Sequence, residues 1–231
     1  MNNAELAVAG GENGRDGEEV LLSAPGELRL RVRNLGQTDY RRTWQAMVAF
    51  TAARTAETPD ELWCCEHSPV LTLGQAGKPE HLLVDQGLPV VKTDRGGQIT
   101  YHGPGQVVIY LLLDLARRTL RVRELVSAIE QAVIDLLAAH GVAAERRGGA
   151  PGVYVGPAKV AALGLRVRRN CCYHGVSLNV DMDLSPFSAI NPCGYPGLPV
   201  TQTRDLGISL TPAQATAALV QQIAAQLEHK P

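Results

Sequence analysis

The sequence lacks any long hydrophobic run: no segment approaches the roughly 18–20 apolar residues that a membrane-spanning helix needs. It also lacks a charge bias, and its formal net charge of −1 favours neither a nucleic-acid surface nor a polybasic membrane patch. Residues 1–19 contain acidic side chains and no apolar core, so they match neither a secretory signal nor a mitochondrial transit peptide. These absences predict a cytoplasmic protein that binds neither nucleic acid nor membranes.

Sequence motifs for metals and nucleotide cofactors are missing as well. The five cysteines, Cys64, Cys65, Cys171, Cys172 and Cys193, show no zinc-type C-x-x-C spacing, so free thiols are expected, with one a candidate for reactivity. The adjacent pair at 171–172 precedes a histidine, but neighbouring residues on a strand point to opposite faces. There is neither a G-x-x-x-x-G-K-[ST] loop nor a Rossmann fingerprint. We therefore expect no metal and no cofactor.

The composition of the 231-residue chain, 45% hydrophobic and 19% charged, is that of an ordinary globular protein with one real core. Strand patterns outnumber helix patterns and do not alternate with them in a regular βαβ rhythm. This favours an α+β fold, a single domain with a mixed β-sheet and packed helices. Strands are predicted at 27–33, 61–67, 70–73, 89–92, 106–113, 152–155, 159–168 and 173–180, and helices at 39–56, about 121–140 and about 212–229.

The domain boundary is expected near residue 27. Residues 1–26 are rich in Gly, Glu and Asn and are typical of a disordered extension, which leaves 27–231 as the folded domain. Within that domain, residues 186–199 are rich in proline and poor in strand signals. They are predicted to form a long loop, and long loops inside compact domains are often functional.

The most informative segment is residues 95–106, which read RGGQITYHGPGQ and lead into the apolar strand pattern of 107–113. Glycine allows backbone angles and close approaches that other residues cannot reach. A tight loop capping a core strand is one interpretation of this segment. The polar side chains among the glycines, which include Arg95 and His102, favour a ligand-holding loop instead.

Two further residues are candidates for catalysis. Cys193, in the segment INPCGY at 190–195, follows a proline and precedes a glycine, a local setting that presents a thiol to a bulky acyl group. Lys159 begins a strand pattern made otherwise of small and apolar residues. A half-buried turn cysteine and an edge lysine in water are the simpler alternatives, and the sequence gives no distance between the two. His174 and His67 fit structural core histidines better than catalysts.

Taken together, these segments resemble the lipoyl(octanoyl) transferase family. The resemblance covers about residues 28–210 in order and rests on RGGQITYHGPGQ at 95–106, KVAALG at 159–164, HGVSLNV at 174–180 and INPCGY at 190–195, with shorter matches at 67–70, 74 and 81–83. The tandem cysteines at 171–172 and the aromatic Tyr173 are not part of the expected pattern. The resemblance implies a fold similar to the catalytic domain of biotin and lipoate protein ligases, so that 27–231 is an acyltransferase catalytic domain.

The resemblance also implies the reaction: transfer of an octanoyl group from octanoyl-acyl carrier protein to a lysine of a lipoyl domain. The acceptors are the lipoyl domains of 2-oxoacid dehydrogenases and the glycine cleavage H protein. Cys193 is expected to hold the acyl group as a thioester and Lys159 to lower its pKa. The implied substrate-binding residues are Arg95, Gly96, Gly97, Gln98, Ile99, Thr100, Tyr101, His102, Ala162, Leu163, Gly164, Gly175, Val176 and Ser177.

The small residues of 161–164 and the glycines of 96–105 are expected to leave room for an acyl tunnel, and backbone N–H groups near Cys193 to stabilise an oxyanion. Burial of seven methylene or methyl groups at ~0.8 kcal/mol each contributes about 5 kcal/mol. Each two-carbon step contributes only ~1.6 kcal/mol. Rejection of ten carbons must therefore come from where the tunnel ends, and the sequence does not locate that end.

Three other functions stay open at this point. An amidotransferase that moves octanoyl or lipoyl groups between lipoyl domains would share the fold and the cysteine. An ATP-dependent lipoate or biotin ligase would not need Cys193. A non-catalytic module that binds acyl carrier protein would form no covalent adduct.

Overall fold

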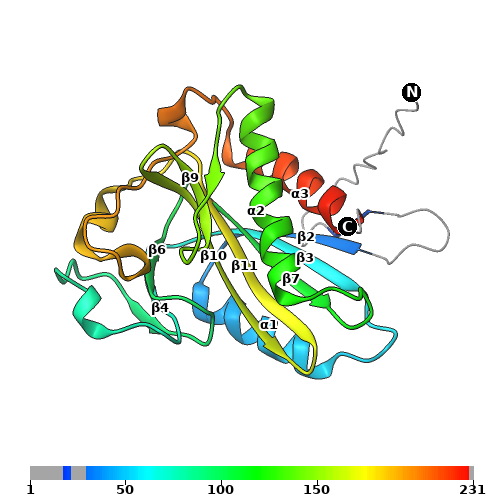
Figure 1. Cartoon of the computed structure of the whole chain (residues 1–231). Coiled ribbons are helices and arrows are strands. Elements are labelled where there is room, and N and C mark those ends of the chain that lie inside the picture. The colour runs from blue at the N-terminus through cyan, green and yellow to red at the C-terminus, as the bar shows by residue number, and fades with distance from the viewer. Residues whose placement is uncertain (1–17, 22–29, 229–231) are drawn as a thin grey trace.

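The computed structural model describes residues 18–21 and 30–228. Its centre is an eight-stranded sheet in the order β1-β2-β3-β7-β11-β10-β9-β8 (Figure 1). The β2–β3 pair is parallel and the other pairs are antiparallel, so the sheet is mixed as predicted. Its strands are β1 (Glu18–Leu21), β2 (Leu30–Thr38), β3 (Asp60–His67), β7 (Gln106–Asp114), β8 (Glu145–Arg146), β9 (Gly152–Val155), β10 (Ala158–Arg168) and β11 (Cys171–Asn179).

A second, three-stranded sheet has the order β5-β4-β6, with β4 (Val70–Leu73) between β5 (Val90–Lys92) and β6 (Ile99–His102). It lies beside the β9–β10 side of the large sheet (Figure 1). Short 3-10 turns lie within the loops: η1 (Pro79–His81), η2 (Ser185–Ala189), η3 (Pro192–Gly194) and η4 (Arg204–Leu206).

Three α-helices cover the large sheet: α1 (Tyr40–Ala53), α2 (Val122–Ala139) and α3 (Pro212–Glu228). Their ends follow local sequence signals. The Asp39 carboxylate accepts a hydrogen bond from the Arg42 backbone N–H and caps α1. At α3, Thr211 and Gln214 exchange side-chain hydrogen bonds with each other's backbone N–H groups.

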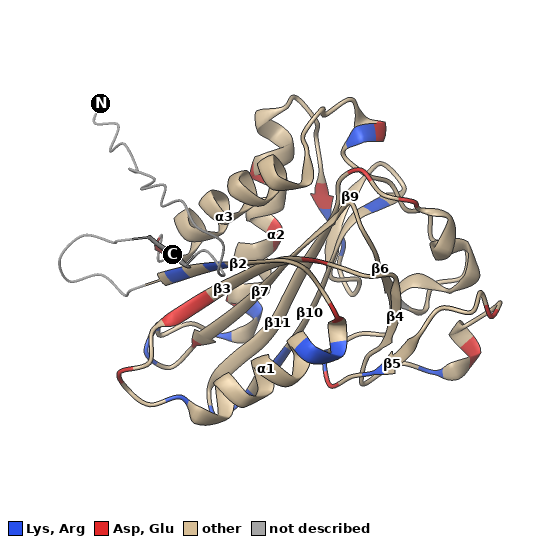
Figure 2. Ribbon diagram, turned by 180° about the vertical axis from the view of Figure 1, so that it is seen from behind, with Lys and Arg blue, Asp and Glu red and all other residues tan. Residues whose placement is uncertain are grey.

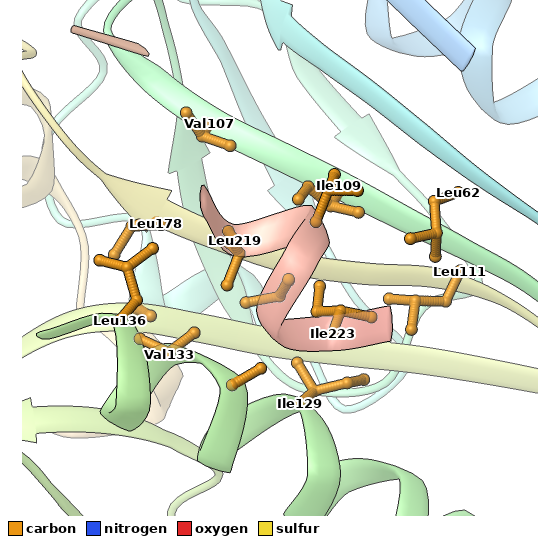
Figure 3. Packing of buried hydrophobic residues seen from close by; sticks show 14 of the residues in the cluster. Leu62, Val107, Ile109, Leu111, Ile129, Val133, Leu136, Leu178, Leu219 and Ile223 are labelled. Atoms are coloured by element: carbon orange, nitrogen blue, oxygen red, sulfur yellow. The ribbon is translucent and has the colours of Figure 1, made fainter. Parts of the chain in front are cut away.

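The main core lies between the large sheet and the pair α2 and α3. On this face of β7 lie the side chains of Val107, Ile109, Leu111 and Leu113. Helix side chains such as Ile129 and Leu219 pack against them (Figure 3). Helix α1 packs on the opposite face, where Met47 contacts a cluster that includes Tyr110 and Leu112. The fully apolar run at 107–113 is therefore buried on both faces, as its sequence predicts.

The predicted helices and most predicted strands are confirmed, with three differences. Residues 95–106 are not one loop, because Ile99–His102 form β6 and pair with β4. Two residues at 145–146 form a strand that the sequence analysis missed. Within the predicted disordered extension, Glu18–Leu21 pair with β2, and the rest of 1–26 lies outside the described residues.

The charged positions show no concentration of one sign in the view of Figure 2, where acidic and basic segments are interspersed over the described elements. Within residues 18–21 and 30–228, no helix is long and apolar enough to cross a membrane.

Candidate active site

A pocket opens between β6, β10 and β11 and brings most of the predicted binding residues together. It encloses about 490 Å³, including the part open to solvent. All of the predicted substrate-binding residues line it except Gly96 and Tyr101. The segments at 95–102, 162–164 and 175–177, far apart in the sequence, thus form one wall. Four residues that the sequence analysis did not include also line it: Tyr40, Val108, Tyr110 and His174.

The two exceptions, Gly96 and Tyr101, lie next to the pocket but do not line it. The Gly96 N–H donates to the carbonyl of Leu165 over 3.0 Å, which ties the glycine-rich segment to β10. Tyr101 points into a separate apolar cluster, where its ring lies 5.5 Å from that of Phe187 in an edge-on arrangement. Thr100 and His102 lie on one face of β6 and line the pocket, whereas Tyr101 lies on the other face with Ile99, which belongs to the same apolar cluster but also lines the pocket.

Arg95 shapes the pocket through its hydrogen bonds. Its guanidinium is buried and donates to the hydroxyl and carbonyl of Thr72 and to the carbonyls of Gly96 and Gln98. Gly74 lies close to the same backbone segment, because a Cβ added at Gly74 would come within 2.4 Å of the Gly97 carbonyl oxygen. The charge of Arg95 thus fixes the backbone of 96–98 against β4.

Lys159 is buried, with only 3% of the residue exposed, so the alternative of a solvent-facing edge lysine is wrong. Its ammonium nitrogen lies 5.3 Å from the centre of the Tyr154 ring on β9. Its stem occupies the space beside Gly152, where an added Cβ would lie 2.3 Å from Lys159 Cε and 2.6 Å from the Ala161 carbonyl oxygen. The glycine, at φ +138°, therefore makes room for the lysine.

A second, smaller cavity lies between Lys159 and the loop at 186–200 and encloses about 280 Å³, including the part open to solvent. Its lining includes Lys159, Pro192 and Val200, and it shares Thr100, Ala162 and Ser177 with the first pocket. The Lys159 backbone holds the loop in place: its N–H donates to the Pro199 carbonyl and its carbonyl accepts from Thr201, each over 2.9 Å. The lysine and the turn η3 thus border one space, which adjoins the larger pocket at these shared residues.

The turn η3 contains Cys193, whose side chain lies outside the described structure, so its role stays a prediction. The backbone around it is fixed: Gly194 N–H donates to the Asn191 carbonyl and Tyr195 N–H to the Pro192 carbonyl. These two N–H groups are engaged in the turn, and the stabilisation of an oxyanion by backbone N–H groups near Cys193 stays a prediction. Gly194 packs against Gln98, whose Cγ would lie 3.2 Å from an added Cβ.

The other four cysteines are in unfavourable places for thiolate chemistry. Cys64, Cys65 and Cys172 are buried in the sheet, and Cys171 is half-buried. Burial raises the pKa of Cys65, and it raises the pKa of Cys172 to about 12. Burial also raises the pKa of Cys171. A thiol with a raised pKa is mostly protonated at neutral pH and is a poor nucleophile.

Histidines and tyrosines form hydrogen-bonded networks along the pocket. His102 Nδ1 lies 2.7 Å from Gln106 Oε1, and the Gln106 amide donates to Asn179. His67 Nδ1 donates to the Thr38 carbonyl, which leaves Nε2 to accept from the Tyr110 hydroxyl over 2.6 Å. Both ring nitrogens of His67 thus have partners, as expected for a core histidine, and His102 is held through Nδ1.

The Asp94 carboxylate accepts three hydrogen bonds, one of them from the pocket residue His174. Its carboxylate accepts from the indole N–H of Trp44, the hydroxyl of Tyr173 and Nε2 of His174, the last over 2.9 Å. Burial alone would raise the pKa of Asp94, but the bonds to His174, Tyr173 and Trp44 hold it below its usual value. Asp94 is therefore an anion that orients the two rings.

Burial keeps the nearby titratable side chains neutral. It lowers the pKa of His102 to about 3, with a smaller contribution from His67, and it also lowers the pKa of His67 and His174. The pKa values of Tyr40 and Tyr110 are raised by burial. Apart from Arg95, whose guanidinium donates to backbone carbonyls, the pocket is lined by neutral side chains and glycines. Such a lining suits a hydrocarbon chain better than a charged ligand.

The sequence contained a signal for some of the pocket residues that were missed. Tyr110 carries the one hydroxyl in the apolar run at 107–113, and Asp94 directly precedes the glycine-rich segment. Tyr154 and Gly152 carried no comparable signal, because only the pairing of β9 with β10 brings them to Lys159.

Comparison with known proteins identifies the family. A model of the lipoyl protein ligase A/B catalytic domain matches residues 39–224. This chain belongs to that family. A protein of Dechloromonas aromatica named octanoyltransferase is 69% identical over 199 residues, which cover 86% of this chain and 97% of that protein. An octanoyltransferase of Aromatoleum aromaticum is 67% identical over 180 residues, which cover 78% of each chain.

Solved structures confirm the fold expected from the resemblance. A lipoate-protein ligase A bound with ATP matches with a TM-score of 0.71 at 16% identity, over 87% of this chain and 85% of the other. A biotin protein ligase from Aquifex aeolicus, in complex with biotin and ATP, matches with a TM-score of 0.53 at 12% identity, over 85% and 70% of the two chains. At such low identities the likeness concerns the architecture alone.

Proposed function

We propose that this protein is an octanoyltransferase that moves an octanoyl group from octanoyl-acyl carrier protein to a lysine of a lipoyl domain, the first step of protein lipoylation. The observation that supports this most directly is the buried Lys159, which shares a cavity with the turn that carries Cys193, next to a pocket suited to a hydrocarbon chain. The high identity to proteins named octanoyltransferase agrees with it. The acceptors are lipoyl domains of 2-oxoacid dehydrogenases and the glycine cleavage H protein.

In the first half-reaction the Cys193 thiolate attacks the carbonyl carbon of the donor thioester. A new bond forms between Cys193 sulfur and the acyl carbon, and the bond to the carrier sulfur breaks. The carrier sulfur takes a proton from the Lys159 ammonium and leaves as a thiol, so Lys159 is a neutral amine when the acceptor arrives. One thioester replaces another, so the step is nearly isoenergetic and needs no ATP. In this scheme the positive charge of Lys159 favours the thiolate over the thiol.

In the second half-reaction the amine of the acceptor lysine attacks the acyl-enzyme. The amide bond forms, the bond to Cys193 breaks, and Lys159 takes the proton that the attacking nitrogen loses. A thioester becomes an amide, which drives this step forward. Covalent catalysis in two steps lets two bulky proteins visit one site in turn.

The test is an ATP-free assay of octanoyl transfer from acyl carrier protein to a purified lipoyl domain. Cys193→Ala is expected to abolish transfer and Cys193→Ser to leave at most a trace, whereas Cys171→Ala, a cysteine outside the site, is expected to keep full activity. Appreciable turnover by Cys193→Ala would rule out the covalent scheme. A requirement for ATP would favour a ligase, and use of an acylated lipoyl domain as donor would favour the amidotransferase.

Lys159→Met is expected to lower kcat by about 10²- to 10⁴-fold, the range for loss of a general acid–base group. Its pH–rate profile is expected to move to higher pH, because the thiolate loses a neighbouring positive charge. Lys92→Met, at an exposed position of β5, is the matched control and should change neither quantity. An unchanged pH profile in Lys159→Met would contradict the proposed effect on the thiol.

A further inference from the structure

One residue that lines the acyl pocket carries a buried polar atom whose purpose the reaction does not explain. His174 is 1% exposed and lines the pocket. Within the described part of the chain, its Nδ1 is one of a few buried side-chain atoms with no hydrogen-bond partner. Such atoms are uncommon in folded proteins and call for an explanation.

The protonation state of His174 follows from its partner. A carboxylate oxygen can only accept, so the contact of Nε2 with Asp94 places the proton on Nε2. Burial lowers the pKa of His174 and keeps the ring neutral. Nδ1 therefore carries a lone pair, a hydrogen-bond acceptor without a partner, on a residue that lines the pocket.

An unusual backbone conformation holds the ring there. His174 has φ +63° in the middle of β11, in the left-handed region that few residues with side chains adopt. The Tyr173 and His174 rings stack with centroids 5.1 Å apart and both contact Asp94, although neighbours on a regular strand point to opposite faces. Backbone strain of this kind concentrates at functional sites.

The strand register gives the distance from the reacting end. Ala162 and Ser177 are directly paired and line both cavities, the one beside Lys159 and the larger one. His174, paired with Leu165, lines only the larger one and lies three residues farther along, or about 10 Å at ~3.3 Å per residue. An extended octanoyl chain measures about 9 Å from carbonyl carbon to methyl.

We propose that the imidazole of His174, held by Asp94, forms the end wall of the acyl pocket and sets its chain-length limit at eight carbons. Its Nδ1 also lets the pocket accept a chain that ends in a hydrogen-bond donor, such as a terminal hydroxyl. Burial energy alone separates eight from ten carbons by only ~1.6 kcal/mol in favour of the longer chain, so a wall is required. This inference rests on the proposed octanoyl transfer.

The first experiment measures kcat/KM with octanoyl- and decanoyl-acyl carrier protein as donors. His174→Asn is the variant of choice, because asparagine shortens the side chain and tolerates a positive φ. The decanoyl-to-octanoyl ratio is expected to rise by about 10-fold or more, the scale of discrimination by added methylenes in apolar pockets. Thermal unfolding of the variant verifies that it folds.

Leu163→Ala is the control, since Leu163 lines the same pocket two residues before the level of His174. It should lower kcat/KM for both donors and leave their ratio unchanged. An unchanged ratio in His174→Asn, or an equal rise in both variants, would overturn the inference while octanoyl transfer stands. If the unmodified protein transfers no octanoyl group, the proposed function itself fails.

The second experiment tests the lone pair with the unmodified protein. A 7-hydroxyheptanoyl donor has the length of octanoyl but ends in a hydroxyl. A hydroxyl buried without a partner costs about 1–3 kcal/mol, whereas Nδ1 of His174 can accept its hydrogen bond. We expect its kcat/KM to stay within about 10-fold of octanoyl. A loss beyond about 100-fold would overturn the assignment of Nδ1 to the chain end.

Discussion

The two faces of β7 differ sharply, although the strand reads as one apolar run. Toward α2 and α3 it presents Val107, Ile109, Leu111 and Leu113, which pack into a hydrophobic core (Figure 3). Toward α1 it presents Val108, Tyr110 and Leu112, and here the Tyr110 hydroxyl donates to a buried histidine. One face therefore supplies stability, and the other supplies the neutral polar wall of a binding pocket.

This difference shows that burial alone does not distinguish residues of the hydrophobic core from residues of the binding site. Both faces are almost fully excluded from solvent, and on both the side chains are closely packed. On the pocket face, however, hydrogen-bonded rings alternate with glycines, and the glycines leave space that a substrate can fill. Substitutions on the two faces should thus have separable effects on stability and on transfer.

The largest expected change in stability comes from the α2–α3 face. Ile109→Ala removes fully buried methyl and methylene groups and leaves a cavity, so the free energy of unfolding should fall by about 2–5 kcal/mol. Urea unfolding measures this, and the decanoyl-to-octanoyl ratio of the folded variant should not change. A change in that ratio would show that the two faces are coupled.

The second-largest expected change in stability is a loss at acidic pH that arises from the histidines of the pocket face. The folded-state pKa of His102, about 3, lies below its unfolded value, so the unfolded chain binds the proton first. Stability is therefore complete above about pH 6.5 and is lost as the pH falls toward 3, by about 2 kcal/mol at pH 5 for this one group. The lowered pKa values of His67 and His174 act in the same direction.

The measurement compares urea unfolding at pH 7 and pH 5 for the unmodified protein and His102→Asn. The variant should lose less stability between the two pH values, by about 2 kcal/mol, whatever its stability at pH 7. An equal loss in both proteins would mean that His102 does not carry this pH dependence.

The smallest expected effect is that of Tyr110→Phe, which keeps the ring and removes the hydroxyl that donates to His67. Loss of one such bond costs about 1 kcal/mol. The same urea titration should register this decrease, well below that of Ile109→Ala on the neighbouring position. A loss as large as that of Ile109→Ala would contradict the distinction between the two faces.

The sequence predicted the elements whose signals are local. The helix at about 121–140 and the strand with the apolar run at 107–113 each depend on neighbouring residues, and each is confirmed. β6 was missed because its four residues lie between glycines and gain strand character only by pairing with β4. Pairing between distant segments is not encoded in the local pattern.

The same limit applies to the site. The pocket residues at 95–102, 162–164 and 175–177 were found from motifs, since glycine and small residues there reflect close packing of backbone and ligand. The burial of Lys159 depends on Gly152 and Tyr154 of another strand, and the orientation of His174 depends on one positive φ. Neither could be read from residue types.

Intact-protein mass spectrometry after mixing the chain with octanoyl-acyl carrier protein, without ATP, tests the central claim most directly. We predict a single octanoyl adduct on Cys193 that disappears when a lipoyl domain is added. No adduct, or adducts spread over Cys64, Cys65, Cys171 and Cys172, would contradict the acyl-enzyme mechanism and favour a module that only binds the acyl carrier protein.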